Sequence, residues 1–136
     1  MKKYLALIMV LSSSCRSNYE RTAIKTECDK FKKGKFFHRS QGDPILYKIE
    51  RTDSIQTEFI GKTGDYVNLK IKWTGPCTYE LTFLNQHIIS MDSVSESDQK
   101  NMKVKVEITK VRNDTSFVIT SDGSDELPGI VYIDKR

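Results

Sequence analysis

The sequence predicts an all-β fold: a single antiparallel sheet of about eight short strands that forms a barrel or a sandwich. Two observations lead to this prediction. From Phe31 onward, apolar residues recur at every second position, which places one face of each strand on a core and the other in water. Turn-forming residues separate these runs about every 8–12 residues. Such short links favour hairpins between neighbouring strands.

The clearest strands lie in the middle of the chain. Residues 67–73, 77–83 and 102–108 each place four apolar side chains at alternate positions, with polar residues between them. Residues 31–39 would form the first strand. Weaker alternation predicts four more, whose inward residues would be Ile45, Tyr47 and Ile49, then Ile55, Thr57 and Phe59, then Phe117 and Ile119, and last Ile130 and Tyr132. Eight strands can close into a lipocalin-like barrel, with an interior that is either filled or holds one small ligand.

Turn-forming sequences fall between these runs, at Gln41–Pro44, Asp53–Ser54, Gly61–Asp65, Gly75–Pro76, Asn113–Asp114 and Asp122–Ser124. One connection differs from the others. Residues 85–101 are long for a hairpin and become polar after Met91. We therefore expect this segment to be a mobile or functional loop.

The N-terminus has the pattern of an export signal. A basic start is followed by the apolar run Tyr4–Leu11 and three serines. A membrane-spanning helix needs about 20 apolar residues, so residues 1–14 are predicted to be a secretory signal instead. Cys15 follows directly and resembles the acylated cysteine of the bacterial lipobox, although Ser12 stands where a Leu is preferred. The alternative is a cleaved signal followed by an ordinary cysteine.

Lipidation at Cys15 would make residues 15–27 a tether and residues 28–136 the β domain, anchored in the cell envelope on the periplasmic or surface side of the outer membrane. Removal of the signal would leave 122 residues with 20 Lys+Arg and 18 Asp+Glu, because Lys2 and Lys3 are lost with it. The formal charge falls from +4 to +2. So balanced a surface implies no nucleic-acid partner. The expected partners are the membrane, an envelope protein or a small apolar ligand.

The two remaining cysteines form an even pair. In an oxidising compartment, a disulfide between Cys28 and Cys77 is the expected state, with two buried free thiols as the alternative. Neither cysteine belongs to a C-x-x-C motif, and their spacing to His38 and His87 matches no common zinc site. No metal and no cofactor are expected.

Several single residues have side chains that could bind a ligand or react, but a structural role is the better interpretation of each. Trp73 lies on the inward face of the clearest strand, and we expect it to be a core anchor beside the disulfide. His38 and His87 are expected to be surface or loop histidines. Arg51 falls on the same face as Tyr47 and Ile49; it is either an inward charge that needs a partner or the end of its strand, and we favour the strand end.

Acidic residues gather in two places, Asp92 with Glu96 and Asp98, and Asp122 with Asp125 and Glu126. Calcium loops need oxygens at fixed positions around a glycine; the first group has no Gly and the second is too short. Solvated loops are the better interpretation.

Three segments carry a resemblance to a family. The motifs are C-x-x-F-x-x-G-x-F over 28–36, R-x-D-S-x-Q-x-E over 51–58 and W-x-x-x-C-x-Y over 73–79. They resemble short, uncharacterised flavobacterial-type (Bacteroidetes) envelope lipoproteins, over most of residues 27–83. No catalytic residues carry over from this resemblance. Such chains sometimes bear the label DNA topoisomerase IV, but a mature chain of 122 residues lacks room for breakage and ATPase modules.

Ser54 and Ser93 each follow an Asp and precede an apolar residue, a pattern that resembles the O-glycosylation acceptor of exported proteins in that bacterial group. The favoured alternative is an Asp-Ser turn.

No phosphate loop, nucleophile elbow or metalloprotease motif is present. The sequence therefore predicts a lipid-anchored envelope protein that is not an enzyme and acts as a binding or assembly module. One alternative is a carrier of a small apolar ligand in a barrel cavity. A less favoured one is a hydrolase that uses loop carboxylates or His87.

Overall fold

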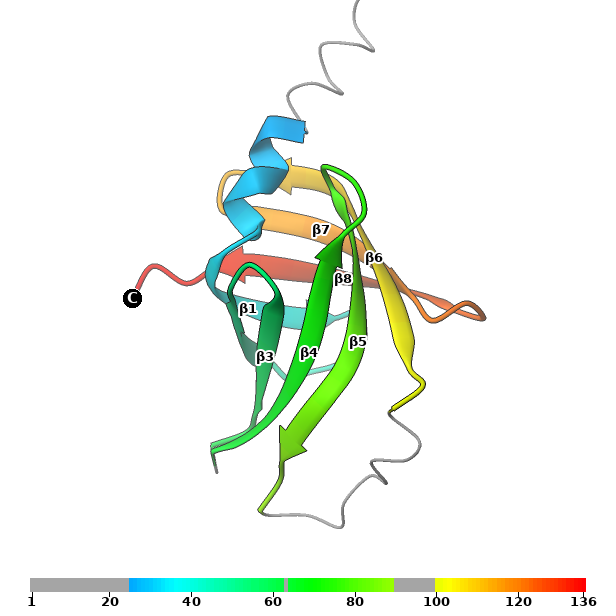
Figure 1. The fold of residues 1–136 in the computed structure, drawn as a ribbon. Coiled ribbons are helices and arrows are strands. Elements are labelled where there is room, and N and C mark those ends of the chain that lie inside the picture. The colour runs from blue at the N-terminus through cyan, green and yellow to red at the C-terminus, as the bar shows by residue number, and fades with distance from the viewer. Residues whose placement is uncertain (1–24, 63, 90–99) are drawn as a thin grey trace, which may run out of the picture.

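A computed structural model describes residues 25–62, 64–89 and 100–136 of the chain. Eight antiparallel strands follow one another around a closed barrel, which confirms the all-β prediction and selects the barrel over the sandwich (Figure 1). The strands are β1 (Gly34–Ser40), β2 (Tyr47–Arg51), β3 (Ile55–Ile60), β4 (Asp65–Trp73), β5 (Thr78–His87), β6 (Lys103–Arg112), β7 (Thr115–Ser121) and β8 (Glu126–Ile133). A helical turn at residues 25–28 continues into the 3-10 helix η1 (Asp29–Phe31).

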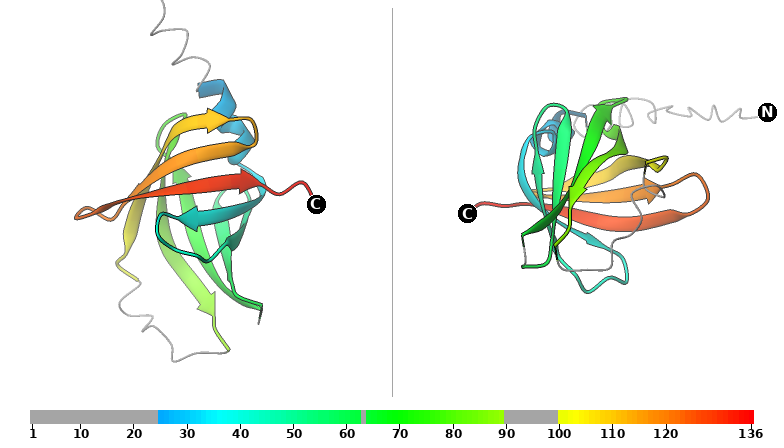
Figure 2. Two further views of the ribbon diagram at one scale, coloured as in Figure 1. Left: turned by 180° about the vertical axis from the view of Figure 1, so that it is seen from behind. Right: turned by 60° about the horizontal axis from the view of Figure 1, so that its bottom comes forward.

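Each strand pairs with the next along the chain, and β8 pairs with β1 to close the sheet. Closure gives each described strand a neighbour on both sides, although β5 pairs with β6 only over Thr78–Thr82. The helical segment and η1 lie at one end of the barrel, with the β2–β3, β4–β5 and β6–β7 hairpins (Figure 2). We call this the η1 end. The β1–β2 and β7–β8 connections lie at the opposite end.

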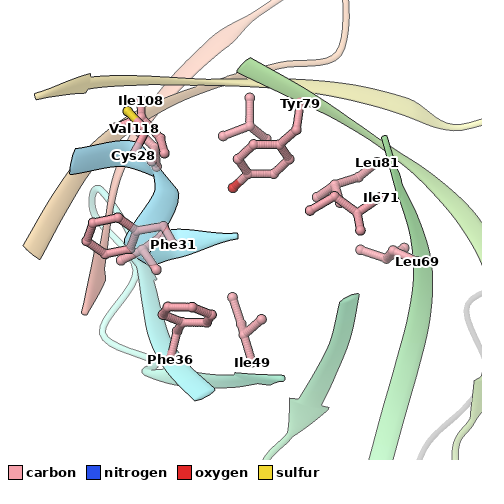
Figure 3. Packing of buried hydrophobic residues seen from close by; sticks show 12 residues of the cluster. Cys28, Phe31, Phe36, Ile49, Leu69, Ile71, Tyr79, Leu81, Ile108 and Val118 are labelled. Carbon is pink, nitrogen blue, oxygen red and sulfur yellow. The ribbon is translucent and has the colours of Figure 1, made fainter. Parts of the chain in front are cut away.

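The inward face matches the prediction where the alternation is strongest. Among the residues predicted to face inward in β4, β5 and β6, those buried are Leu69, Ile71, Tyr79, Leu81, Val106 and Ile108. These side chains and Phe36, Ile49, Val118 and Val131 form one core cluster (Figure 3).

The predicted inward face is wrong in β3, β7 and β8. β3 buries Gln56 and so turns Ile55, Thr57 and Phe59 outward. β7 buries Ser116 and Val118 rather than Phe117 and Ile119, and β8 buries Val131 rather than Ile130 and Tyr132. The physical reason is that this interior accepts polar side chains, while the outer wall lets aromatic residues pack across strands: the ring centroids of Phe59 and Tyr66 are 6.4 Å apart.

Two predicted boundaries also change. The first strand begins at Gly34 rather than at residue 31, because Phe31 belongs to η1 and is 0% exposed. β5 extends to His87, so residues 85–87 of the predicted loop are strand. Its polar end is held by side chains: Asn68 donates a hydrogen bond to Asn85 over 2.9 Å, and Tyr66 stacks on His87. Most of the rest of that loop lies outside the described residues.

The predicted pairing of Cys28 with Cys77 is supported. The two residues form a disulfide, with Cα atoms 5.4 Å apart. The bond ties the helical segment to the β4–β5 hairpin. The predicted signal, residues 1–14, and Cys15 lie outside the described residues. Within the described part of the chain, no helix combines the length and the apolar character that a membrane crossing requires.

Candidate functional site

A cavity of about 200 Å³ lies inside the barrel. Its wall is mostly apolar, formed by Ile49, Leu69, Leu81, Phe83, Met102, Val104, Val106, Val118 and Val131. Six polar side chains also line the cavity: His38, Arg51, Gln56, Glu58, Tyr79 and Thr120. An apolar enclosure with a few convergent polar groups is the usual form of a small-molecule site.

Arg51 is the centre of the polar group at the η1 end. It is 5% exposed, and its three guanidinium nitrogens donate to Gln56 Oε1 over 2.7 Å, to the Phe31 carbonyl over 2.7 Å and to the Tyr79 hydroxyl over 2.6 Å. The guanidinium also lies 5.2 Å from the ring centroid of Phe36 and 4.8 Å from that of Tyr79. The favoured interpretation of Arg51 as a mere strand end is wrong. It is the last residue of β2, but its charge is inward and partnered.

The β2–β3 hairpin explains this arrangement. The tight turn at residues 52–54 places Arg51 opposite Gln56 in the strand register. Glu58 follows two residues later on the same face of β3 and also lines the cavity. The Gln56 amide donates to Glu58 Oε1 over 2.6 Å, so Gln56 stands between the arginine and the carboxylate.

Glu58 is electrostatically unusual. Burial raises the pKa of its carboxyl above the ordinary range, although the Gln56 hydrogen bond and the Arg51 charge lower it in part. Burial likewise raises the pKa of the Tyr79 hydroxyl, which therefore stays protonated near neutral pH. A carboxylate placed against an apolar wall is costly to ionise unless a positive partner comes close.

His38 in β1 also lines the cavity, so the prediction of a surface or loop histidine is wrong at this position. Burial and the Arg51 charge lower the pKa of its imidazole, against the opposing charge of Asp43. The imidazole is therefore neutral near neutral pH. His87, in contrast, is exposed at the end of β5, where its ring stacks on Tyr66 with centroids 5.4 Å apart.

Residues of the helical segment and of η1 pack into the η1 end of the barrel, next to Arg51. Phe31 and Cys28 are both 0% exposed, and the Phe31 ring stacks on Phe36 with centroids 6.0 Å apart. Figure 3 shows Phe31, Phe36 and Tyr79 reaching into the same interior. Trp73 is half-buried, packs against the core and has its ring centroid 4.7 Å from that of Tyr79. Residues of the three motif segments, 28–36, 51–58 and 73–79, thus meet at this end.

The other candidate residues lie away from the cavity. Ser54 is exposed in the β2–β3 turn. Asp122 is an exposed turn residue whose carboxylate accepts hydrogen bonds from Ser124 and the Asp125 amide, which lowers its pKa to about 2. Ser93, Asp92, Glu96 and Asp98 lie outside the described residues. No cluster of His, Cys, Asp and Glu suited to a metal ion occurs in the described part of the chain.

A second hollow, of about 500 Å³, lies on the outer wall of the barrel. It is lined by residues 39–43 and by parts of β6, β7 and β8, including Phe117, Ile119 and Ile130. It is the larger of the two, but it is a surface groove, and no buried polar group of the interior network lines it.

Comparisons with models of protein families, with curated proteins and with solved structures gave no match to this chain.

Proposed function

We propose that this chain is a lipid-anchored barrel that binds one small, largely apolar molecule in its interior. The observation that carries the proposal is the cavity of about 200 Å³ with its apolar wall and its few polar groups. Eight-stranded barrels of this kind are wide enough to hold one small ligand. Because the interior is not filled, the ligand carrier becomes the better of the predicted binding roles, ahead of an assembly module.

The size of the cavity limits the ligand. An apolar cavity of about 150 Å³ in another protein, engineered T4 lysozyme, holds benzene, while sites for drug-sized ligands begin near 300 Å³. A cavity of about 200 Å³ therefore suits one ring with a short substituent. A long acyl chain would not fit inside the barrel.

A hydrolase is the weaker candidate. It would use His87 or loop carboxylates, yet His87 lies exposed at the end of β5 and Asp122 is engaged in its own turn.

The cavity is tested by filling it. Val104→Phe adds a ring to the cavity wall from β6, whereas Lys105→Phe adds the same ring to the exposed face one residue further on. We expect Val104→Phe to weaken binding of 2-phenylethanol by about tenfold or more, since excluding the ligand removes its apolar contacts, and Lys105→Phe to leave binding unchanged. Isothermal titration calorimetry measures both. Equal affinity in the two variants would contradict binding inside the barrel.

The lipid anchor rests on the sequence, through the apolar run Tyr4–Leu11 and the cysteine that follows the serines. We expect mass spectrometry of the mature chain to find an N-terminal Cys15 with a diacylglyceryl group and an acylated amine. More than one acyl chain gives stable membrane attachment, which a single chain does not. An unacylated N-terminus at any other position would end the lipoprotein proposal.

A further inference from the structure

Glu58 is the acidic group of the cavity, and its hydrogen bonding is incomplete. Its Oε1 accepts the Gln56 amide over 2.6 Å, and no other described residue donates a hydrogen bond or forms an ion pair with this carboxylate. It lies on β3 among apolar wall residues such as Leu69 and Leu81. A carboxylate has about four lone-pair sites, so Glu58 keeps accepting capacity toward the cavity.

Arg51 forms no ion pair with Glu58. Its three nitrogens donate to Gln56, Phe31 and Tyr79, and the Gln56 amide, not the guanidinium, donates to the Glu58 carboxylate. Arg51 is the one permanently charged cation among the described residues that line the cavity, and the imidazole of His38 is held neutral. The interior thus contains an arginine whose hydrogen bonds go to neutral groups and a carboxyl group that has no cation in contact with it.

We infer that the ligand carries a primary amine on its ring-sized apolar body, and that Glu58 binds this ammonium group. The inference rests on the proposed function, since it assigns the polar end of the same cavity. An ammonium supplies both the missing donors and the missing positive charge, whereas a hydroxyl supplies donors alone. A ligand carboxylate would add a second negative charge beside Glu58, and the Arg51 guanidinium already donates to three other acceptors.

The test is a calorimetric titration of the full chain with three ligands of matched shape: 2-phenylethylamine, 2-phenylethanol and 3-phenylpropionate. We expect the amine to bind about tenfold or more tighter than the alcohol, because hydrogen bonds between charged partners are the stronger class, and the acid to bind most weakly. Glu58→Gln should remove the preference for the amine and keep the binding of the alcohol. Glu50→Gln, on the outer face of β2, should change neither.

Binding of the alcohol or the acid as tight as that of the amine would overturn the inference and leave the proposed function standing. A preference for the amine that survives Glu58→Gln would also overturn it. Failure of all three ligands to bind would overturn the proposed function as well. Glu58→Gln keeps the shape and the Gln56 contact and removes a carboxyl group whose ionisation burial opposes, so we expect a folded protein, which its melting curve verifies.

The pH profile gives a second readout. The groups that interact with or share the cavity of Glu58 are Arg51 and Tyr47 of β2, Tyr79 of β5 and His38 of β1. Because the ammonium needs the ionised carboxylate, amine affinity should fall as the pH drops through the pKa of Glu58, which burial has raised. His38 gains charge on the acid side as well, so the fall that Glu58 causes is the part that disappears in Glu58→Gln. An unchanged profile in that variant would contradict the assignment.

Discussion

Replacing Arg51 with Ala should lower the free energy of unfolding by about 3–5 kcal/mol, among the largest effects expected of a single residue in this domain. The side chain joins η1, β3 and β5 through its bonds to Phe31, Gln56 and Tyr79. Its removal leaves three buried acceptors without their donor, and each costs free energy when it has no replacement partner. Urea denaturation measures the change.

Two further variants make the Arg51 result specific. Arg51→Lys should rescue little, because a single ammonium cannot reproduce the planar fork that reaches acceptors on three elements. Arg39→Ala, an exposed arginine on β1, should change stability by less than about 0.5 kcal/mol. A loss at Arg51→Ala no larger than that at Arg39→Ala would mean that the buried network does not hold the η1 end together.

Removing the disulfide should have a comparable effect. Cys28 and Cys77 are separated by 49 residues, and closing a loop of that length is worth about 4 kcal/mol in the chain-entropy model. The total stability of a small domain is about 5–15 kcal/mol, so the Cys28→Ala, Cys77→Ala double variant should be strongly destabilised. The loss should concentrate at the η1 end, because the bond holds the helical segment there.

Reductant provides the control for this second prediction. The denaturation midpoint of the unmodified chain should fall when dithiothreitol is added, whereas that of the double variant should not respond. A midpoint that is the same with and without reductant in the unmodified chain would show that the bond contributes no stability.

The strands that the sequence predicted best are those whose inward residues are all apolar. β4, β5 and β6 alternate without exception over several residues, so period two is enough to find them and their inward face. β3 misled the prediction because its buried residue Gln56 is polar while its outward Ile55 and Phe59 are not. Hydrophobicity alone assigns such a strand to the opposite face.

Only part of the candidate site could be predicted from the sequence. A signal did exist: the turn at 52–54 pairs Arg51 with Gln56 and puts Glu58 two residues further along the same face, so three polar residues at this spacing fall on one side of a hairpin. The sequence did not predict that Phe31 and Tyr79 accept hydrogen bonds from Arg51. These residues come from distant segments, which η1 and the closure of the barrel bring together. His38 was missed for the same reason, as a lone histidine carries no sign of the wall it faces.

Methyl NMR during titration with 2-phenylethylamine shows directly whether the ligand enters the barrel interior. The methyl groups of Leu81, Val104 and Val106 line the cavity, whereas those of Ile119 and Ile130 line the groove on the outside. We expect saturable shifts for the interior methyl groups and none for the outer ones. Shifts confined to Ile119 and Ile130, or no shifts at all, would contradict binding inside the barrel.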